Sequence, residues 1–185
     1  MPGTVFTVGH GTRSAEELVE ILNTAGVAVL VDVRRFPASR RHPRFGREEM
    51  ERWLSATGVD YVWQGEELGG RRKPAGDATR HPAWRNAAFQ GYADHTDSAI
   101  FRSAIEDLER KSTSSPMAIL CAETLWWRCH RRLIADTLEL RGTKVVHLIT
   151  PGNSQPHPVN PAARLGADGW PVYDLGETTS LSLET

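Results

Sequence analysis

Residues 4–33 read TVFTVGHGTRSAEELVEILNTAGVAVLVDV, and this stretch decides the fold. Its first five residues are β-branched or aromatic and its last seven are mainly apolar, which predicts two strands buried on both faces. Between them Ser14 and Glu17 form a capping box, and Gly26 stands where a helix C-cap is expected. The stretch therefore predicts two parallel strands joined by a helix in a right-handed crossover.

The rest of the chain continues this alternation. Strands are predicted at 4–8, 27–33, 61–63, 117–121 and 144–149, and helices at 15–25, 47–57, 98–111 and 129–141. This order predicts an α/β fold, a single three-layer domain with a mainly parallel sheet of about five strands flanked by helices. We assign residues 1–149 to this α/β domain. Residues 150–185 are expected to form an irregular loop and a C-terminal tail packed on or near it, because residues 150–161 are rich in proline, glycine and asparagine.

Length and composition narrow the class of protein. The chain has 185 residues, of which 39% are hydrophobic and 24% charged, and no apolar run approaches the length of a membrane span. These values exclude collagen-like, wholly disordered and integral membrane proteins. The amino-terminal residues have no secretion-signal pattern, so a cytoplasmic location is expected. The two cysteines, Cys121 and Cys129, are too few for a disulfide framework and are expected to be thiols there.

The charges are distributed unevenly along the chain. The net charge is −1, but residues 34–47 contain six arginines and no acid, and residues 71–85 contain five basic residues and one acid. Guanidinium groups bind phosphate through paired hydrogen bonds. This pattern predicts a phosphate-bearing small molecule or a nucleic acid as the partner, and no membrane. The sequence does not determine an oligomeric state.

Chemically useful side chains follow the predicted strands. In open parallel sheets the ligand binds outside the carboxyl ends of the strands. Cys121 stands at such an end as a candidate nucleophile, and Glu123 is a candidate base or a partner that orients a histidine. Cys129 is expected to be a buried, inert cysteine or to have a supporting role in the site. The predicted catalytic residues are His10, Asp32, Cys121, Glu123 and His130.

The expected phosphate-binding groups come from several segments. The turn between Gly9 and Arg13 is expected to offer backbone amides to an anion, although it has neither the GxxxxGK nor the GxGxxG spacing. Trp126 is a candidate for base stacking, with packing against a neighbouring helix as the alternative. The predicted binding residues are Gly9, Gly11, Arg13, Arg34, Arg40, Arg41, Glu67, Gly69, Gly70, Arg71, Arg72, Trp126 and Arg131. We predict no cofactor and no metal, because the cysteine spacing matches no common zinc pattern.

Together these motifs resemble those of one known family, the domain of unknown function 488 family, over roughly residues 4 to 174. The motifs are Thr7–Arg13, Asp32–Pro37 with Ser39, Arg40 and Arg41, Glu67–Arg72, Trp84 and Arg85 with Phe89, Gly91 and Tyr92, Cys121–Glu123 ahead of Cys129–Arg131, and His157, Pro161, Ala163 and Arg164. The resemblance implies a bacterial or archaeal α/β domain and supports the predicted site residues, but it implies no particular reaction.

Three hypotheses of function follow. The leading one is an enzyme that acts on a nucleotide or a nucleic acid by hydrolysis or group transfer, through the Cys121, Glu123 and His130 constellation. Sulfur chemistry on Cys121, glycosidic cleavage by Glu123 or Asp32, and phosphoester hydrolysis all fit these residues. The second is a nucleic-acid-binding module without catalysis, and the third is a metal or redox sensor that uses the two cysteines.

Overall fold

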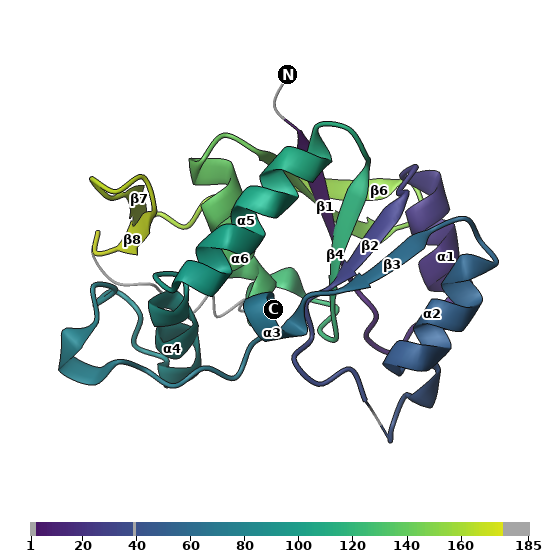
Figure 1. Cartoon of the computed structure of the whole chain (residues 1–185), viewed down its shortest axis with the longest axis horizontal. Helices are drawn as coiled ribbons and strands as arrows, with labels where there is room; N and C mark the ends of the chain where they lie inside the picture. The colour runs from purple at the N-terminus through teal and green to yellow at the C-terminus, as the bar shows by residue number, and fades with distance from the viewer. Residues whose placement is uncertain (1–2, 39, 176–185) are drawn as a thin grey trace, which may run out of the picture.

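A mainly parallel sheet forms the centre of the molecule (Figure 1). The computed structural model describes residues 3–38 and 40–175. Within these residues the main sheet has six strands in the order β3-β2-β4-β1-β5-β6, of which only β6 is antiparallel to its neighbour. The strands are β1 (Thr4–Gly9), β2 (Val29–Asp32), β3 (Asp60–Trp63), β4 (Met117–Cys121), β5 (Lys144–Thr150) and β6 (Asn153–Pro156).

Helices cover both faces of the sheet, so the fold is the predicted three-layer α/β arrangement. Helices α1 (Ala15–Thr24) and α2 (Arg47–Ser55) lie on one face. On the other face lie α4 (Ala87–His95), α5 (Ala99–Ser112) and α6 (Arg131–Leu140). Successive residues of a strand point to opposite faces. Accordingly Ile119 packs in the core under α5 and α6, and Leu120 packs in the core under α1 and α2.

The predicted helix between the first two strands begins and ends as its sequence indicates. The Ser14 hydroxyl accepts a hydrogen bond from the Glu17 backbone N–H at 3.1 Å, and the Glu17 carboxylate accepts one from the Ser14 N–H at 2.6 Å. Gly26 follows the helix with a φ of 67°, the left-handed conformation that a helix C-terminus often requires. Local chemistry therefore sets both ends of α1.

The structure differs from the sequence prediction after residue 149 and around residue 90. The stretch expected to be irregular contains β6 and a separate two-stranded sheet of β7 (Ala163–Leu165) and β8 (Pro171–Tyr173). Residues 176–185 of the predicted tail lie outside the described residues. Helix α4 was not predicted, and its Gly91 is required because a Cβ there would lie 2.2 Å from the Arg72 carbonyl oxygen. The three strands form by local antiparallel pairing, β6 with β5 and β7 with β8, whereas Gly91 of α4 packs against a segment that precedes the helix.

The strand order places a crevice at the carboxyl end of β4. The helices that follow β1 and β2 lie on one face, whereas α6, which follows β4, lies on the other. Ligands of open α/β sheets bind where the chain changes face in this way. The short helix α3 (Gly65–Leu68) follows β3 at the same end of the sheet.

None of the helices formed by the described residues has both the length and the hydrophobicity needed to cross a bilayer.

Candidate active site at the carboxyl end of the sheet

A cavity of about 460 Å³ opens at the carboxyl ends of β2 and β4. Its walls come from the segments after these two strands, the segment after α3, the first two turns of α4 and the entry to α6. The lining residues are Arg34, Arg35, Phe36, Gly70, Arg71, Asn86, Ala88, Phe89, Tyr92, Cys121, Ala122, Glu123, Arg128, Cys129 and His130. Of the predicted site residues, Arg34, Gly70, Arg71, Cys121, Glu123 and His130 therefore share one cavity.

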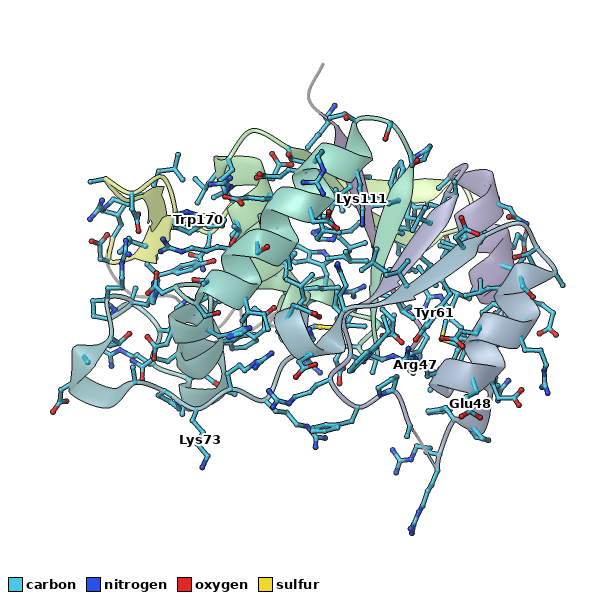
Figure 2. The ribbon with its side chains drawn as sticks, in the orientation of Figure 1. Arg47, Glu48, Tyr61, Lys73, Lys111 and Trp170 are labelled. Carbon is cyan, nitrogen blue, oxygen red and sulfur yellow. A yellow bond between two sulfur atoms is a disulfide. The ribbon has the colours of Figure 1, made fainter. Side chains whose placement is uncertain are left out.

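The carboxylate of Asp32, which the sequence predicts to be catalytic, has its acceptor sites occupied within the protein. Oδ1 accepts hydrogen bonds from the backbone N–H of Arg34 at 3.0 Å and from its Nε at 2.8 Å. Oδ2 accepts from Nη2 of Arg34 at 2.6 Å and from the hydroxyl of Tyr61, labelled in Figure 2, at 2.5 Å. A carboxylate has about four acceptor sites, and all are occupied in a fully buried position. Asp32 therefore positions Arg34 instead of reacting with a substrate.

His10 also lies behind Arg34 and does not line the cavity. Its Nε2 accepts a hydrogen bond from Nη1 of Arg34 at 3.2 Å, and its Nδ1 donates to the Gly11 carbonyl at 3.0 Å. The imidazole stacks on Phe45 with the ring centroids 4.4 Å apart. Burial, reinforced by the charge of Arg34, lowers the pKa of His10 to about 4. His10 is therefore a neutral side chain that helps to orient Arg34 and lies outside the cavity wall.

The turn after β1 does not offer its amides to an anion as predicted. The N–H groups of His10 and Gly11 donate to the carbonyls of Cys121 and Ala122 at 3.1 and 2.9 Å, and the Arg13 N–H donates to the His10 carbonyl. The Arg13 side chain donates to the Ile149 carbonyl instead of reaching the cavity. A Cβ at Gly9 would lie 1.9 Å from the Glu123 carbonyl oxygen, and one at Gly11 would lie 1.9 Å from Oγ1 of Thr124. The two glycines are therefore needed for close packing against the loop after β4.

The sulfur atoms of the two cysteines meet in the cavity, where the structure pairs Cys121 with Cys129. Their Cα atoms are 7.5 Å apart, which is beyond the roughly 7 Å that a disulfide spans without movement of the backbone, so the expectation of two thiols stays a prediction. The backbone N–H of Glu123 donates to Sγ of Cys121 at 3.3 Å. The imidazole predicted to assist Cys121 lies instead beside Cys129, with Nδ1 of His130 3.6 Å from Sγ.

The ring of His130 is fixed from both sides. Its Nε2 donates to the Val33 carbonyl at 3.1 Å, which leaves Nδ1 as the acceptor nitrogen of a neutral imidazole. Burial is the largest influence and lowers the pKa of His130 to about 4, with further lowering from the charges of Arg131 and Arg72. Gly70 packs on the ring, since a Cβ there would lie 3.0 Å from Nδ1. His130 is therefore an unprotonated acceptor at neutral pH.

Glu123 supplies an exposed carboxylate to the cavity. The carboxylate forms no hydrogen bond with any other residue that the structure describes, whereas the backbone of Glu123 is firmly held. The Glu123 carbonyl accepts from Nη2 of Arg131 at 2.7 Å, and the same nitrogen donates to the Thr124 carbonyl at 3.0 Å. The loop is therefore fixed while the acid remains available to a ligand.

Two arginines predicted to bind phosphate are used to hold the backbone. Arg131 is 1% exposed and binds the loop after β4, and burial lowers the pKa of its guanidinium to about 9. Arg72 donates through Nε to the Gly69 carbonyl at 2.9 Å and through Nη2 to the Glu66 carbonyl at the start of α3. Neither guanidinium is among the groups that line the cavity.

Five other predicted residues lie away from the cavity. Glu67 lines a different hollow between α3 and α5. Trp126 is buried and stacks on His147 of β5 with the ring centroids 4.3 Å apart, so its ring is covered in this structure. Arg40 and Arg41 are exposed on the connection between β2 and α2. Gly69 does not line the cavity but packs against Arg35, whose Cβ would lie 2.7 Å from a Cβ at Gly69.

Sequence reasoning missed several residues of the cavity wall. Arg35, Phe36, Asn86, Phe89, Tyr92 and Arg128 line the cavity but were not predicted as site residues. The sequence did contain a signal for Phe89 and Tyr92, because both belong to a motif of the family that the chain resembles. Arg128 and Asn86 stand in irregular segments whose direction only the fold determines.

No three His, Cys, Asp or Glu side chains of the described residues converge as a metal ion would require.

The comparisons with known proteins agree with the motif analysis. A family model described as "Domain of unknown function DUF488" matches residues 14–138, which is more than half of the chain. No curated protein matches the chain, and no solved structure does either. The matched range begins at the N-cap of α1 and ends inside α6, so it includes every residue that lines the cavity. The chain therefore belongs to the DUF488 family.

Proposed function

We propose that the protein is a cytoplasmic enzyme that acts on a phosphate-bearing substrate, a nucleotide or a nucleic acid, by group transfer or hydrolysis. The observation that carries this proposal is the content of one cavity. A sulfur pair, an imidazole and a carboxylate lie at its inner end, and Arg35, Arg71 and Arg128 lie around them. None of these three guanidinium groups forms an ion pair with a described residue, so their charge is available to an anion.

The remaining N–H of Arg34 supports the same proposal. Its guanidinium has five N–H groups, of which four donate to Asp32, Met50 and His10. One N–H of Nη1 is left, and Arg34 lines the cavity. A guanidinium that its neighbours already hold in place loses little side-chain entropy when it binds a phosphate oxygen. Arg34 is therefore a preorganised donor at the inner end of the site.

In this proposal Cys129 is the nucleophile, because it is the cysteine beside the free nitrogen of His130. In a reducing cytoplasm the paired cysteines are two thiols. As the sulfur of Cys129 attacks the electrophilic centre of the substrate, its proton moves to Nδ1 of His130. The bond to the leaving group breaks, and His130 returns that proton to the leaving group. Water or an acceptor alcohol then attacks the bound group and gives its proton to Glu123. The bond to Sγ breaks, and that proton returns to the thiolate of Cys129.

The test is turnover of a panel of nucleotides and short oligonucleotides by the reduced protein, followed by chromatography. We expect Cys129→Ser, His130→Gln and Glu123→Gln each to lower kcat by about 100-fold or more. Glu49→Gln, which removes an exposed carboxylate on α2, is the matched control and should leave turnover unchanged. Intact-mass analysis of rapidly quenched protein should show a covalent adduct that Cys129→Ser lacks.

A second candidate function is binding of nucleic acid without catalysis, favoured by the exposed Phe36 between arginines at the mouth of the cavity. This alternative requires that the Cys129, His130 and Glu123 variants bind the panel as the unchanged protein does and that no member of the panel is converted. Conversion that depends on Cys129 excludes it.

A further inference from the structure

The mouth of the cavity carries an exposed aromatic ring between two cations. Phe36 is 63% exposed, more than any other large apolar side chain of the described residues. The guanidinium carbons of Arg35 and Arg71 each lie 5.7 Å from the centroid of the Phe36 ring. An exposed aromatic ring flanked by cations offers a face on which a nucleic-acid base can stack. We call Arg35, Phe36 and Arg71 the rim platform.

The backbone fixes the rim platform at two points. Arg71 has a φ of 61° and is the one non-glycine residue with positive φ among those described. This left-handed conformation costs about 1–2 kcal/mol for an L-residue and is often retained at functional sites. Gly69 lets the segment after α3 lie against Arg35, because a Cβ there would meet the Cα of Arg35 at 2.9 Å. Two segments more than thirty residues apart in sequence are therefore held together at one edge of the cavity.

Positive charge continues from the rim platform along the connection between β2 and α2. Arg40, Arg41 and Arg44 are exposed on this connection, and none of the three forms an ion pair within the described residues. Figure 1 shows the connection leaving the end of β2 and extending beyond the ends of the strands to the lowest point of the view. A free mononucleotide would occupy only the cavity, whereas a longer polyanion would also reach these exterior charges.

We infer that the rim platform and the connection after it bind single-stranded nucleic acid, which places one nucleotide in the cavity. This inference rests on the proposed function and names its substrate class. The phosphodiester backbone runs along Arg40, Arg41 and Arg44, and one unpaired base stacks on Phe36. A base inside a duplex has both faces covered by its neighbours, so a single exposed ring selects an unstacked strand. A cavity of about 460 Å³ also admits one nucleotide and excludes a helix of paired bases.

The experiment is fluorescence anisotropy with a labelled 12-nucleotide single strand, as DNA and as RNA, the same sequence as a duplex, and AMP as competitor. We expect the single strand to bind at least tenfold more tightly than the duplex or AMP. Phe36→Ala should weaken binding of the single strand by about 5- to 100-fold, and Phe36→Tyr should restore it because the ring is retained. A variant with both Arg40→Ala and Arg41→Ala should lower the slope of log K against log salt concentration by about 1.4.

Arg52→Ala is the matched control for the arginine variants, because Arg52 is exposed on α2 in an ion pair with Glu49. It should leave affinity and salt slope unchanged, and circular dichroism should show the same melting temperature for all variants. Equal affinity for duplex and single strand, or a Phe36→Ala variant with unchanged affinity, overturns the inference. If the inference fails in this way but AMP is bound and its conversion depends on Cys129, the proposed function stands without the single-strand inference. If no member of the panel is bound or converted, both fail.

Discussion

Nδ1 of His130 lies 3.6 Å from Sγ of Cys129, while Nε2 of the same ring donates to the carbonyl of Val33, 97 residues earlier in the chain. His130 can accept a proton from Cys129 only because the Val33 carbonyl fixes which nitrogen of the imidazole carries the hydrogen. With Nε2 committed as a donor, Nδ1 is the nitrogen that can accept a proton from the thiol. The end of β2 therefore determines what the cysteine and histidine at the entry to α6 can do.

The protonation state of His130 provides the first prediction. Its pKa is lowered to about 4 by burial, so the imidazole should stay neutral from pH 8 down to about pH 5. Two-dimensional NMR of the labelled imidazole should therefore show no titration near 6.5, the ordinary value for histidine. The assignment comes from the signal that His130→Gln removes. A midpoint at or above 6.5 would show that His130 carries a positive charge beside Cys129 and would contradict the neutral tautomer.

The second prediction concerns Asp32 and Arg34. Asp32→Asn leaves a buried guanidinium without its carboxylate, so the free energy of unfolding should fall by about 3–5 kcal/mol. Urea denaturation followed by circular dichroism measures the change. The double variant with Asp32→Asn and Arg34→Met should recover part of the loss, because no uncompensated charge remains. Glu49→Gln breaks an exposed pair and should cost less than about 1 kcal/mol. Equal effects of Asp32→Asn and Glu49→Gln would contradict this account.

Stability should fall on mild acidification. Burial lowers the pKa values of His10, His95 and His130 to about 4 and that of His147 to about 2, whereas these groups titrate near 6.5 in the unfolded chain. Between pH 6.5 and pH 4 the unfolded chain therefore binds more protons than the folded protein, so protonation favours unfolding. Each histidine lowers the free energy of unfolding by at most about 1.4 kcal/mol per pH unit in this range.

Urea denaturation at pH 7.5, 6.0 and 5.0 measures this effect. Stability should be nearly constant above pH 7 and should decline between pH 6 and pH 5. His10→Asn removes one of the four histidines and should give a shallower decline than the unchanged protein. Equal stability at pH 7.5 and pH 5.0 would show that the buried histidines titrate normally.

The fourth prediction concerns Gly9. In Gly9→Ala the new Cβ would lie 1.9 Å from the Glu123 carbonyl oxygen, and the loop that carries Cys121 and Glu123 would have to move. Gly58→Ala is the control, because no atom lies within 4 Å of its Cβ and only its φ of 77° opposes alanine, at a cost of about 1–2 kcal/mol. Gly9→Ala should lower the melting temperature more than Gly58→Ala and should also lower turnover. Equal melting temperatures would contradict close packing at Gly9.

Much of the fold was predictable because its signals are local. The capping box at Ser14, the apolar runs of β2 and β4 and the stripe on α5 each involve residues a few positions apart, and hydrophobic periodicity records them directly. Helix α4 and strand β6 were missed because neither carries a clear hydrophobic pattern, although Asn86 caps α4 and β6 pairs with β5 in a local hairpin. Helix α4 contains Gly91, and β6 is a polar edge strand with all four residues exposed.

The sequence by itself determined the α/β fold and the set of chemically active residue types at the strand ends, including Cys121, Glu123 and Arg34. Tertiary structure alone decided which of them face the cavity. Asp32 and Arg131 have the side chains of an active site, yet their hydrogen-bonding capacity is spent on Arg34 and on the loop after β4. The physical reason is that a polar group in the interior must find a partner, and that partner is selected by three-dimensional proximity and not by position along the chain.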